Sequence, residues 1–124
     1  MLPSLTPEDI GPTGFVLLFA LKRSQLARPL FRVPSEGQYV WLFDILTSPA
    51  APGPDPAFVA KMLARNRRLF EKARALGGTR YPIGTQEFSR QDWRIQYGEV
   101  YEAFKRAKRR FDPDSILSPG AGIF

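Results

Sequence analysis

Gln91 to Phe124 read QDWRIQYGEVYEAFKRAKRRFDPDSILSPGAGIF, and the spacing of the apolar residues in this stretch predicts one amphipathic helix. Pro113 ends the predicted helix, and Asp112 can cap the short turn that follows. The predicted apolar face consists of Trp93, Tyr97, Val100, Tyr101, Phe104, Ala107 and Phe111. A chain end is usually polar, whereas this one is Ile123-Phe124. We therefore expect the apolar end to be inserted into another part of a protein.

The composition is that of one globular domain or part of one, since the chain has 124 residues and 44% of them are hydrophobic. It contains no cysteine and no histidine, which removes thiolate chemistry, the commonest general base and the commonest metal ligands. The acidic residues are scattered without metal-ligand spacing. We therefore expect no catalytic residue set, no metal site and no cofactor bound by this chain alone.

The sequence shows no segment for membrane insertion or secretion. The longest apolar run, residues 15–21, is much shorter than the roughly 20 residues that a membrane-spanning helix needs. The N-terminus also lacks the basic and then apolar layout of a signal peptide. We therefore expect a cytoplasmic protein without membrane contact.

The net charge of +6 permits an anionic partner such as a nucleic acid. The cations, however, do not alternate with exposed aromatic residues as they do on nucleic-acid-binding surfaces. Instead they line the predicted outer faces of two helices: Arg65, Arg67, Arg68, Lys72, Arg74, and then Lys105 to Arg110. We interpret them as solvated helix faces and do not expect nucleic-acid binding.

Two apolar runs and two helical patterns predict an α+β fold, with a small antiparallel sheet and helices packed on one of its faces, as in half of a ferredoxin-like domain. Residues 15–21 and 38–46 are the predicted long strands, and residues 79–82 a short one. A helix runs between them from Asp55-Pro56 to the stop at Gly77-Gly78. So small a sheet leaves an unpaired edge. We expect a second copy of the chain or an upstream segment to complete it.

The second predicted strand carries one acidic residue, Asp44, among apolar neighbours. Asp44 either reaches water or a backbone amide near the strand end, or it faces a substrate. Trp41 belongs to the same strand. If the strand lines a pocket, Trp41 and Asp44 are the candidate wall residues.

The tail also carries a resemblance to a known family. Its motifs are Trp93-x-x-Gln96-Tyr97-Gly98, Lys108-x-x-Phe111-Asp112-Pro113 and Ile116-Leu117-Ser118-Pro119-Gly120-x-Gly122-Ile123-Phe124. They resemble the end of cytokinin dehydrogenases and related FAD-linked oxidases of the vanillyl-alcohol-oxidase type. Weaker similarity upstream, at Gly11-Pro12, Trp41–Leu46 and Tyr81-Pro82, extends the resemblance over nearly the whole chain.

The resemblance implies a fold and a set of site residues. Residues 1–90 would be part of a substrate domain of the FAD-linked oxidase C-terminal type, and residues 91–124 a helix and tail that dock on an FAD-binding domain. Ile123 and Phe124 would then pack against the flavin domain. The cofactor-adjacent positions implied by the family are Tyr81, Pro119, Gly120, Ala121 and Gly122.

The chain departs from the family pattern in ways that bear on activity. Ala121 replaces the usual glutamine of the tail, and Gln96 replaces a histidine. The FAD-binding region and the catalytic residues of the family have no counterpart in this sequence. The resemblance therefore implies part of an FAD-dependent oxidoreductase that is catalytically silent alone. The alternative is a stand-alone, non-enzymatic module that dimerises through its sheet edge.

Overall fold

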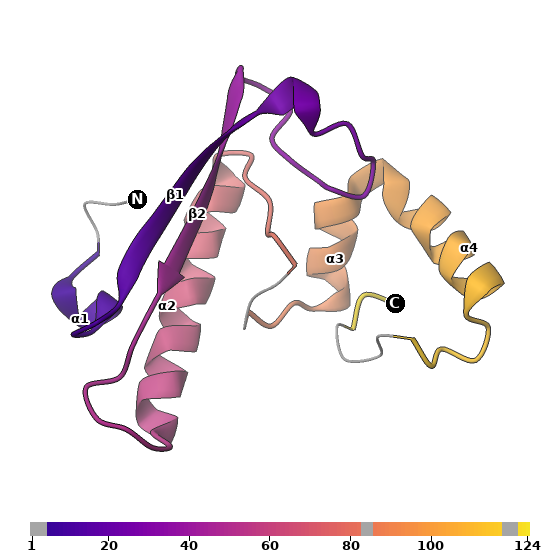
Figure 1. The fold of residues 1–124 in the computed structure, drawn as a ribbon. Coiled ribbons are helices and arrows are strands. Elements are labelled where there is room, and N and C mark those ends of the chain that lie inside the picture. Colours follow the sequence, from indigo (N-terminus) through magenta and orange to yellow (C-terminus); the bar gives the residue numbers. More distant parts are fainter. Residues whose placement is uncertain (1–4, 83–85, 118–121) are drawn as a thin grey trace. The chain divides into compact units, whose positions relative to one another are not determined.

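The computed structural model describes residues 5–82, 86–117 and 122–124, and these belong to two compact units (Figure 1). Unit 1 comprises residues 1–27 and 33–79, and unit 2 comprises residues 28–32 and 80–124. The elements of unit 1 are α1 (Pro7–Ile10), β1 (Phe15–Lys22), the 3-10 turn η2 (Arg23–Gln25), β2 (Tyr39–Leu46) and α2 (Pro56–Ala75). The elements of unit 2 are α3 (Arg90–Tyr97), the 3-10 turn η3 (Gly98–Val100) and α4 (Tyr101–Phe111).

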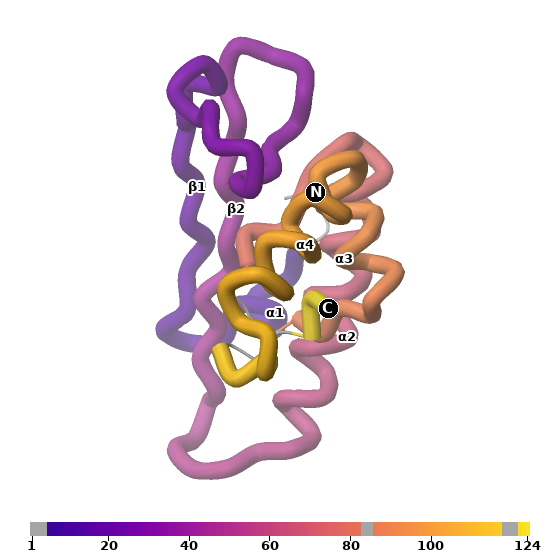
Figure 2. The backbone as a smooth tube through the Cα atoms, turned by 90° about the vertical axis from the view of Figure 1, so that its right-hand side faces the viewer, coloured from indigo at the N-terminus to yellow at the C-terminus, as the bar shows by residue number. Residues whose placement is uncertain are grey.

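The sheet of unit 1 is the antiparallel pair β1–β2, which confirms the α+β class. Its register runs from Phe15 opposite Leu46 to Lys22 opposite Tyr39. Apolar side chains project from both faces because both strands are apolar at nearly every position. Helix α2 runs alongside the sheet in both views (Figures 1 and 2). The expected third strand at residues 79–82 is absent, since these described residues form no β-bridge.

The side chain of Arg65 lies inside unit 1, not on the outer face of α2 as the charge pattern predicted. Arg65 is only 4% exposed. Its guanidinium donates to the backbone oxygen of Asp9 and, at 3.0 Å, to the hydroxyl of Thr47, and it also bonds the side chain of Asn66. Burial lowers its pKa. Because a buried cation must be paired with acceptors, Arg65 fastens α1 and the end of β2 to α2.

The starts of the unit 1 helices are set by capping side chains, and Asp55 is the helix start that the sequence predicted. Thr6 and Asp9 form a capping box at α1, and the Asp55 carboxylate accepts the amide of Phe58 at 2.9 Å at the start of α2. The buried face of α2 consists of Met62, Arg65, Leu69 and Phe70. Val59 on the same helix and Leu76 just after its end are exposed.

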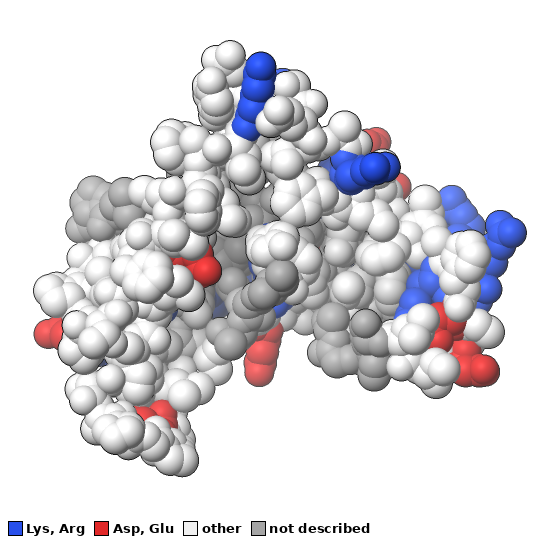
Figure 3. All heavy atoms as spheres, viewed as in Figure 1, with Lys and Arg blue, Asp and Glu red and all other residues white. Residues whose placement is uncertain are grey.

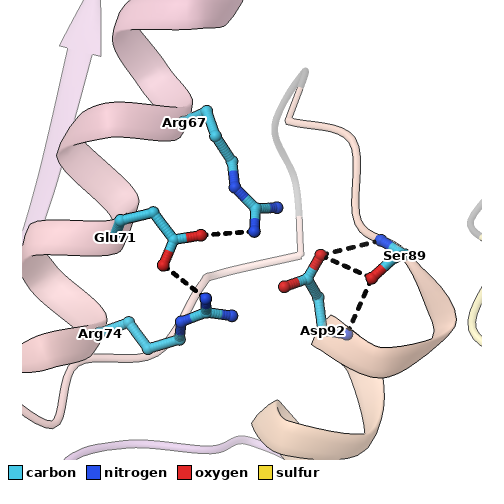
Figure 4. A network of polar contacts seen from close by, with 5 residues as sticks. All are labelled: Arg67, Glu71, Arg74, Ser89 and Asp92. Carbon is cyan, nitrogen blue, oxygen red and sulfur yellow. Dashed lines mark hydrogen bonds and ion pairs between the residues drawn. The ribbon is translucent and has the colours of Figure 1, made fainter.

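Half-buried side chains of α2 form a small ion-pair network (Figure 4). Glu71 pairs with Arg67 one turn before it and with Arg74 nearly one turn after it. Both guanidinium groups also lie over the ring of Phe70, at 5.9 and 5.4 Å from its centroid. The cations of Arg67 and Arg74 therefore have structural partners.

The long helix expected between residues 91 and 111 is two helices, so this prediction is wrong. α3 ends at Gly98, whose φ of 52° and ψ of −131° interrupt the helix, and α4 begins only after η3. Such a positive φ favours glycine because it has no Cβ. At its other end α3 begins with a capping box of Ser89 and Asp92, in which each backbone amide bonds the other side chain (Figure 4).

The core of unit 2 is aromatic. Trp93, Tyr97 and Tyr101 are buried, and Phe88, Val100, Phe104 and Ile123 pack against them. Trp93 is the most enclosed side chain, at 2% exposure. Phe111, by contrast, is 74% exposed, and Ala107 is exposed as well. The predicted apolar face is therefore correct for its first five members and wrong for its last two.

Candidate functional site

The residues predicted to lie near a cofactor or substrate are distributed over both units. Trp41 and Asp44 belong to unit 1, whereas Tyr81 and Gly122 belong to unit 2. Pro119, Gly120 and Ala121 lie outside the described residues. Each group is therefore described within its own unit.

The two candidate pocket-wall residues of β2 lie on opposite faces of the sheet. Trp41 is opposite Ala20 and Asp44 is opposite Leu17, and successive pairs along a ladder alternate between faces. Both residues are exposed, Trp41 to 64%. Their side chains therefore cannot line one pocket on the same face, and at most one of them can have the wall role that the sequence suggests.

Tyr81 presents an exposed aromatic ring on unit 2. It is 46% exposed, and its ring meets that of Phe31 edge-on at 5.8 Å. Pro82 follows it and biases its backbone toward an extended conformation. A half-exposed ring held on one edge can provide a contact surface for a planar ligand.

The residue before Tyr81 is held by a two-point hydrogen bond that the sequence did not reveal. The side-chain carboxamide of Gln96 accepts the amide of Arg80 at 2.8 Å and donates to the carbonyl of Arg80 at 2.9 Å. The guanidinium of Arg80 lies over the rings of Phe88 and Trp93, at 4.6 and 5.3 Å. We call this arrangement of Arg80 and Gln96 the clasp. The only sequence signal for it was Gln96 itself, a polar residue one turn after Trp93.

Burial changes the titration of two groups in this region. It lowers the pKa of Arg80, although an arginine stays protonated in proteins, and it raises the pKa of Tyr97. The charge of Arg80 acts on Tyr97 in the opposite direction and is the smaller effect. Tyr97 is therefore a neutral phenol at physiological pH, and Arg80 is a fixed cation.

The start of the tail is locked to the end of α4 by Asp112, as the sequence predicted. Its carboxylate accepts the amides of Ile116 at 2.9 Å and Leu117 at 3.0 Å and pairs with the ammonium of Lys108. Lys108 also donates to the carbonyl of Leu117 at 2.5 Å. The hydrogen bond from Lys108 is the main cause that holds the pKa of Asp112 below its usual value, helped by the two amides.

The end of the tail is fixed to the same helix. The Tyr101 hydroxyl donates to the carbonyl of Ile123 at 2.8 Å. The ring of Phe124 lies 6.3 Å from that of Tyr101 and 4.9 Å from that of Phe104. Within this chain Ile123 and Phe124 pack against the aromatic side chains of α3 and α4. Their expected packing against a flavin domain stays a prediction.

The described site residues offer exposed side-chain and backbone surface for contacts. No group of three or more acidic, histidine or cysteine side chains that could hold a metal occurs in the described ranges. Gly122 has a φ of 58° and open space where a Cβ would stand. Nor does any helix in the described part of the chain have the length and apolarity needed to cross a membrane.

Comparison with known proteins gives consistent matches. A family model described as "Cytokinin dehydrogenase 1, FAD and cytokinin binding" matches residues 3–124. The chain is 36% identical over 117 residues to an uncharacterized oxidoreductase, ORF5 in the fasciation locus of Rhodococcoides fascians, with 94% of this chain and 25% of the relative covered. It is 38% identical over 93 residues to cytokinin dehydrogenase 8 of Oryza sativa subsp. indica, covering 68% of this chain and 17% of the relative. It is 31% identical over 137 residues to cytokinin dehydrogenase 3 of Oryza sativa subsp. japonica, with 100% of this chain and 24% of the relative covered.

These matches cover most of this chain but only a small part of each relative. The chain spans only 25%, 17% and 24% of the lengths of these three relatives. No solved structure gives a significant match. The family model, however, extends over almost every residue of this chain, the anchored tail included. The chain therefore belongs to the family that forms the FAD- and cytokinin-binding part of cytokinin dehydrogenases.

Proposed function

We propose that this chain is the C-terminal, substrate-domain portion of an FAD-dependent oxidoreductase of the cytokinin dehydrogenase type. In that enzyme it forms part of the pocket wall and a cap over the flavin. The observation that carries the proposal is the family match through the tail, together with the two-ended anchoring of that tail on α4. The anchoring holds Leu117 and Ile123, the described residues on either side of the segment proposed to cap the cofactor.

The residues of this chain would bind and orient the flavin and the substrate but would not take part in the reaction. Bound FAD supplies the hydride acceptor for a substrate C–H bond next to nitrogen. Tyr81 and Gly122 would contact the flavin ring, with Pro119, Gly120 and Ala121 beside it. Trp41 or Asp44, on opposite sheet faces, would line the substrate side. The site contains no catalytic residue in this proposal, so the chain alone is expected to be silent and to hold no FAD.

The exposed apolar surface of unit 1 supports docking on an FAD-binding domain. Phe15 and Phe19, on one face of the sheet, are 53% and 49% exposed, and Trp41, on the other face, is 64% exposed. The surface over the sheet is mostly uncharged, whereas lysine and arginine side chains gather over α4 (Figure 3). Exposed large apolar side chains on a sheet face are typical of protein contacts. The interface we propose is therefore between the sheet of unit 1 and the FAD-binding domain.

A chimera tests the proposal directly. The segment of cytokinin dehydrogenase 3 that matches this chain is replaced by this chain, and FAD retention and cytokinin-dependent dye reduction are measured. The chimera should retain FAD and oxidise cytokinin, whereas the relative truncated before the segment should not. Tyr81→Ala should lower turnover in the chimera, and Phe111→Ala, a change at an exposed aromatic residue of α4, should affect it less. Tight stoichiometric FAD binding by this chain alone would contradict the proposal.

A second candidate function is a non-enzymatic module that forms a homodimer through its sheet edge. It is favoured by the sheet itself, because β1 and β2 pair only with each other among the described residues, which leaves one edge on each strand. Light scattering over a hundredfold range of concentration separates the two. A stable dimer that persists on dilution supports the module, and a monomer that binds a separately produced FAD domain supports the enzyme portion.

A further inference from the structure

We propose that Gln96 is a positioning residue that holds Arg80 extended and thereby directs Tyr81 out of the protein. The role of Tyr81 at a flavin rests on the proposed function above, whereas the effect of Gln96 on Tyr81 rests on geometry alone. Gln96 is buried, at 8% exposure, and both of its described hydrogen bonds go to the backbone of one residue.

The clasp has the hydrogen-bond pattern of a β-ladder. In an antiparallel pair, a residue exchanges both its N–H and its C=O with one partner across the ladder. The carboxamide of Gln96 reproduces this partner, because it accepts from the Arg80 amide at 2.8 Å and donates to the Arg80 carbonyl at 2.9 Å. Both backbone groups of Arg80 can reach one carboxamide only if they lie on the same side of the chain. The clasp therefore requires an extended backbone at Arg80, although no strand forms there.

An extended backbone decides where the next side chain goes. Successive side chains of an extended segment project to opposite sides. The side chain of Arg80 points toward the aromatic core of unit 2, since its guanidinium lies over the rings of Phe88 and Trp93. Tyr81 must then point away from this aromatic core, and its 46% exposure agrees. Pro82 reinforces the arrangement by restricting Tyr81 itself to extended conformations.

A carboxamide can make both hydrogen bonds to the backbone of Arg80 at once. It presents one donor and one acceptor in the same direction, as a peptide group does. An ionised glutamate keeps the acceptor but has no donor for the Arg80 carbonyl. An alanine has neither group. The proposal therefore predicts a graded response to substitution that depends on hydrogen bonding and not on side-chain volume.

The experiment compares the full-length chain with its variants Gln96→Ala, Gln96→Glu and Gln91→Ala. Gln91→Ala is the matched control, because Gln91 is an exposed glutamine of the same helix. Hydrogen exchange at the Arg80 amide and the 19F shift of fluorotyrosine at Tyr81 are followed by NMR. We expect Gln96→Ala to accelerate exchange of the Arg80 amide about 10- to 30-fold and to move the Tyr81 resonance. The resonances of the buried Tyr97 and Tyr101 should stay in place.

The variants separate this inference from the proposed function. Gln96→Glu keeps the size of the side chain, so it should fold as the parent does and still accelerate exchange at Arg80. If the Arg80 amide and the Tyr81 resonance respond no more to Gln96→Ala than to Gln91→Ala, the inference is overturned. If they respond as expected while the chimera with the native chain fails to oxidise cytokinin, the positioning role stands and the proposed function fails.

Discussion

The hydrogen bond between Tyr101 and the end of the chain can be removed without changing the packing around it. Tyr101→Phe deletes the hydroxyl that donates to the Ile123 carbonyl at 2.8 Å and keeps the ring that stacks on Phe124. Tyr101 is 5% exposed and the carbonyl it bonds belongs to a half-buried residue. The substitution therefore reports on the anchoring of the tail and on little else.

The magnitude follows from the kind of bond that is lost. A neutral hydrogen bond in a partly buried setting contributes about 1 kcal/mol net. Because about 1.4 kcal/mol corresponds to a tenfold change in an equilibrium, the open population of the tail should rise about fivefold. The aromatic contacts of Phe124 with Tyr101 and Phe104 remain, so the tail should stay closed most of the time.

A carboxypeptidase measures the opening directly, since it releases Phe124 only from the open tail. When closing is fast compared with cleavage, the rate of release follows the open population. We expect Tyr101→Phe to release Phe124 about fivefold faster than the parent chain. Tyr39→Phe, the same chemical change at an exposed tyrosine of unit 1, is the control and should leave the rate unchanged. Equal rates for the parent and Tyr101→Phe would refute the anchoring argument.

Three further substitutions test other contacts that stabilise each unit internally. Asp112 has a folded-state pKa below its ordinary value of 3.8 because of its bond from Lys108, so its stabilisation is present above about pH 4 and lost as the pH falls through the folded-state pKa. Asp112→Asn should remove that part of the acid dependence of unfolding in urea. Arg65→Ala leaves the acceptors at Asp9 and Thr47 without their donor and should destabilise unit 1 by about 2–4 kcal/mol in urea unfolding. Trp93→Ala should destabilise unit 2 by about 3–5 kcal/mol, seen as loss of its near-ultraviolet circular dichroism.

Each of these three substitutions has its own control or its own contradicting result. Arg68→Ala, an exposed arginine on the same helix as Arg65, should change stability by less than about 0.5 kcal/mol. A similar loss of stability for Arg65→Ala and Arg68→Ala would show that the effect comes from helix propensity and not from the burial of Arg65. For Asp112→Asn, an unchanged acid limb of the stability profile would mean that Asp9, whose pKa is also lowered, carries the dependence. A Trp93→Ala protein that retains its aromatic signal would disprove the assigned core of unit 2.

Local features of the fold could be predicted from the sequence because their causes are local. The two strands follow from runs of β-branched and aromatic residues, and Asp55 caps α2 through a side chain that accepts the amide three residues further on. Asp112 was likewise predicted to cap the turn that follows it. For both caps the partners lie within five residues along the chain, so a short stretch of sequence contains both halves of the interaction.

Two incorrect predictions, for Arg65 and for the helix across Gly98, could have been avoided from signals present in the sequence. Arg65 lies between Met62 and Leu69 at helical spacing, so it belongs to the buried stripe, and its burial needed acceptors from elsewhere in unit 1. Gly98 lies within a helical pattern, where a glycine lowers confidence in continuity. The apolar face was correct as far as Phe104, but the spacing could not exclude a backbone conformation at Gly98 that interrupts the helix.

The candidate site was less predictable because its contacts join distant parts of unit 2. The clasp connects Arg80 with Gln96, and the tail anchor connects Tyr101 with Ile123, each across an intervening loop or helix. The pairing of Trp41 with Asp44 failed for a simpler reason. They are three residues apart on a strand, and an odd separation places side chains on opposite faces.

The anchoring of the tail changes what docking on a flavin domain would require. An apolar end that became ordered only on binding would lose conformational freedom at that moment and weaken the association. Here Leu117 and Ile123, on either side of the cofactor-adjacent segment, are already bonded to α4, and Tyr81 is already directed outward by the clasp. Tyr81, one of the residues proposed to meet the flavin, is therefore oriented in advance, and the surface left to drive association is the apolar sheet of unit 1. It follows that Trp41→Ser should weaken docking without loosening the tail, and Tyr101→Phe should loosen the tail with little effect on docking.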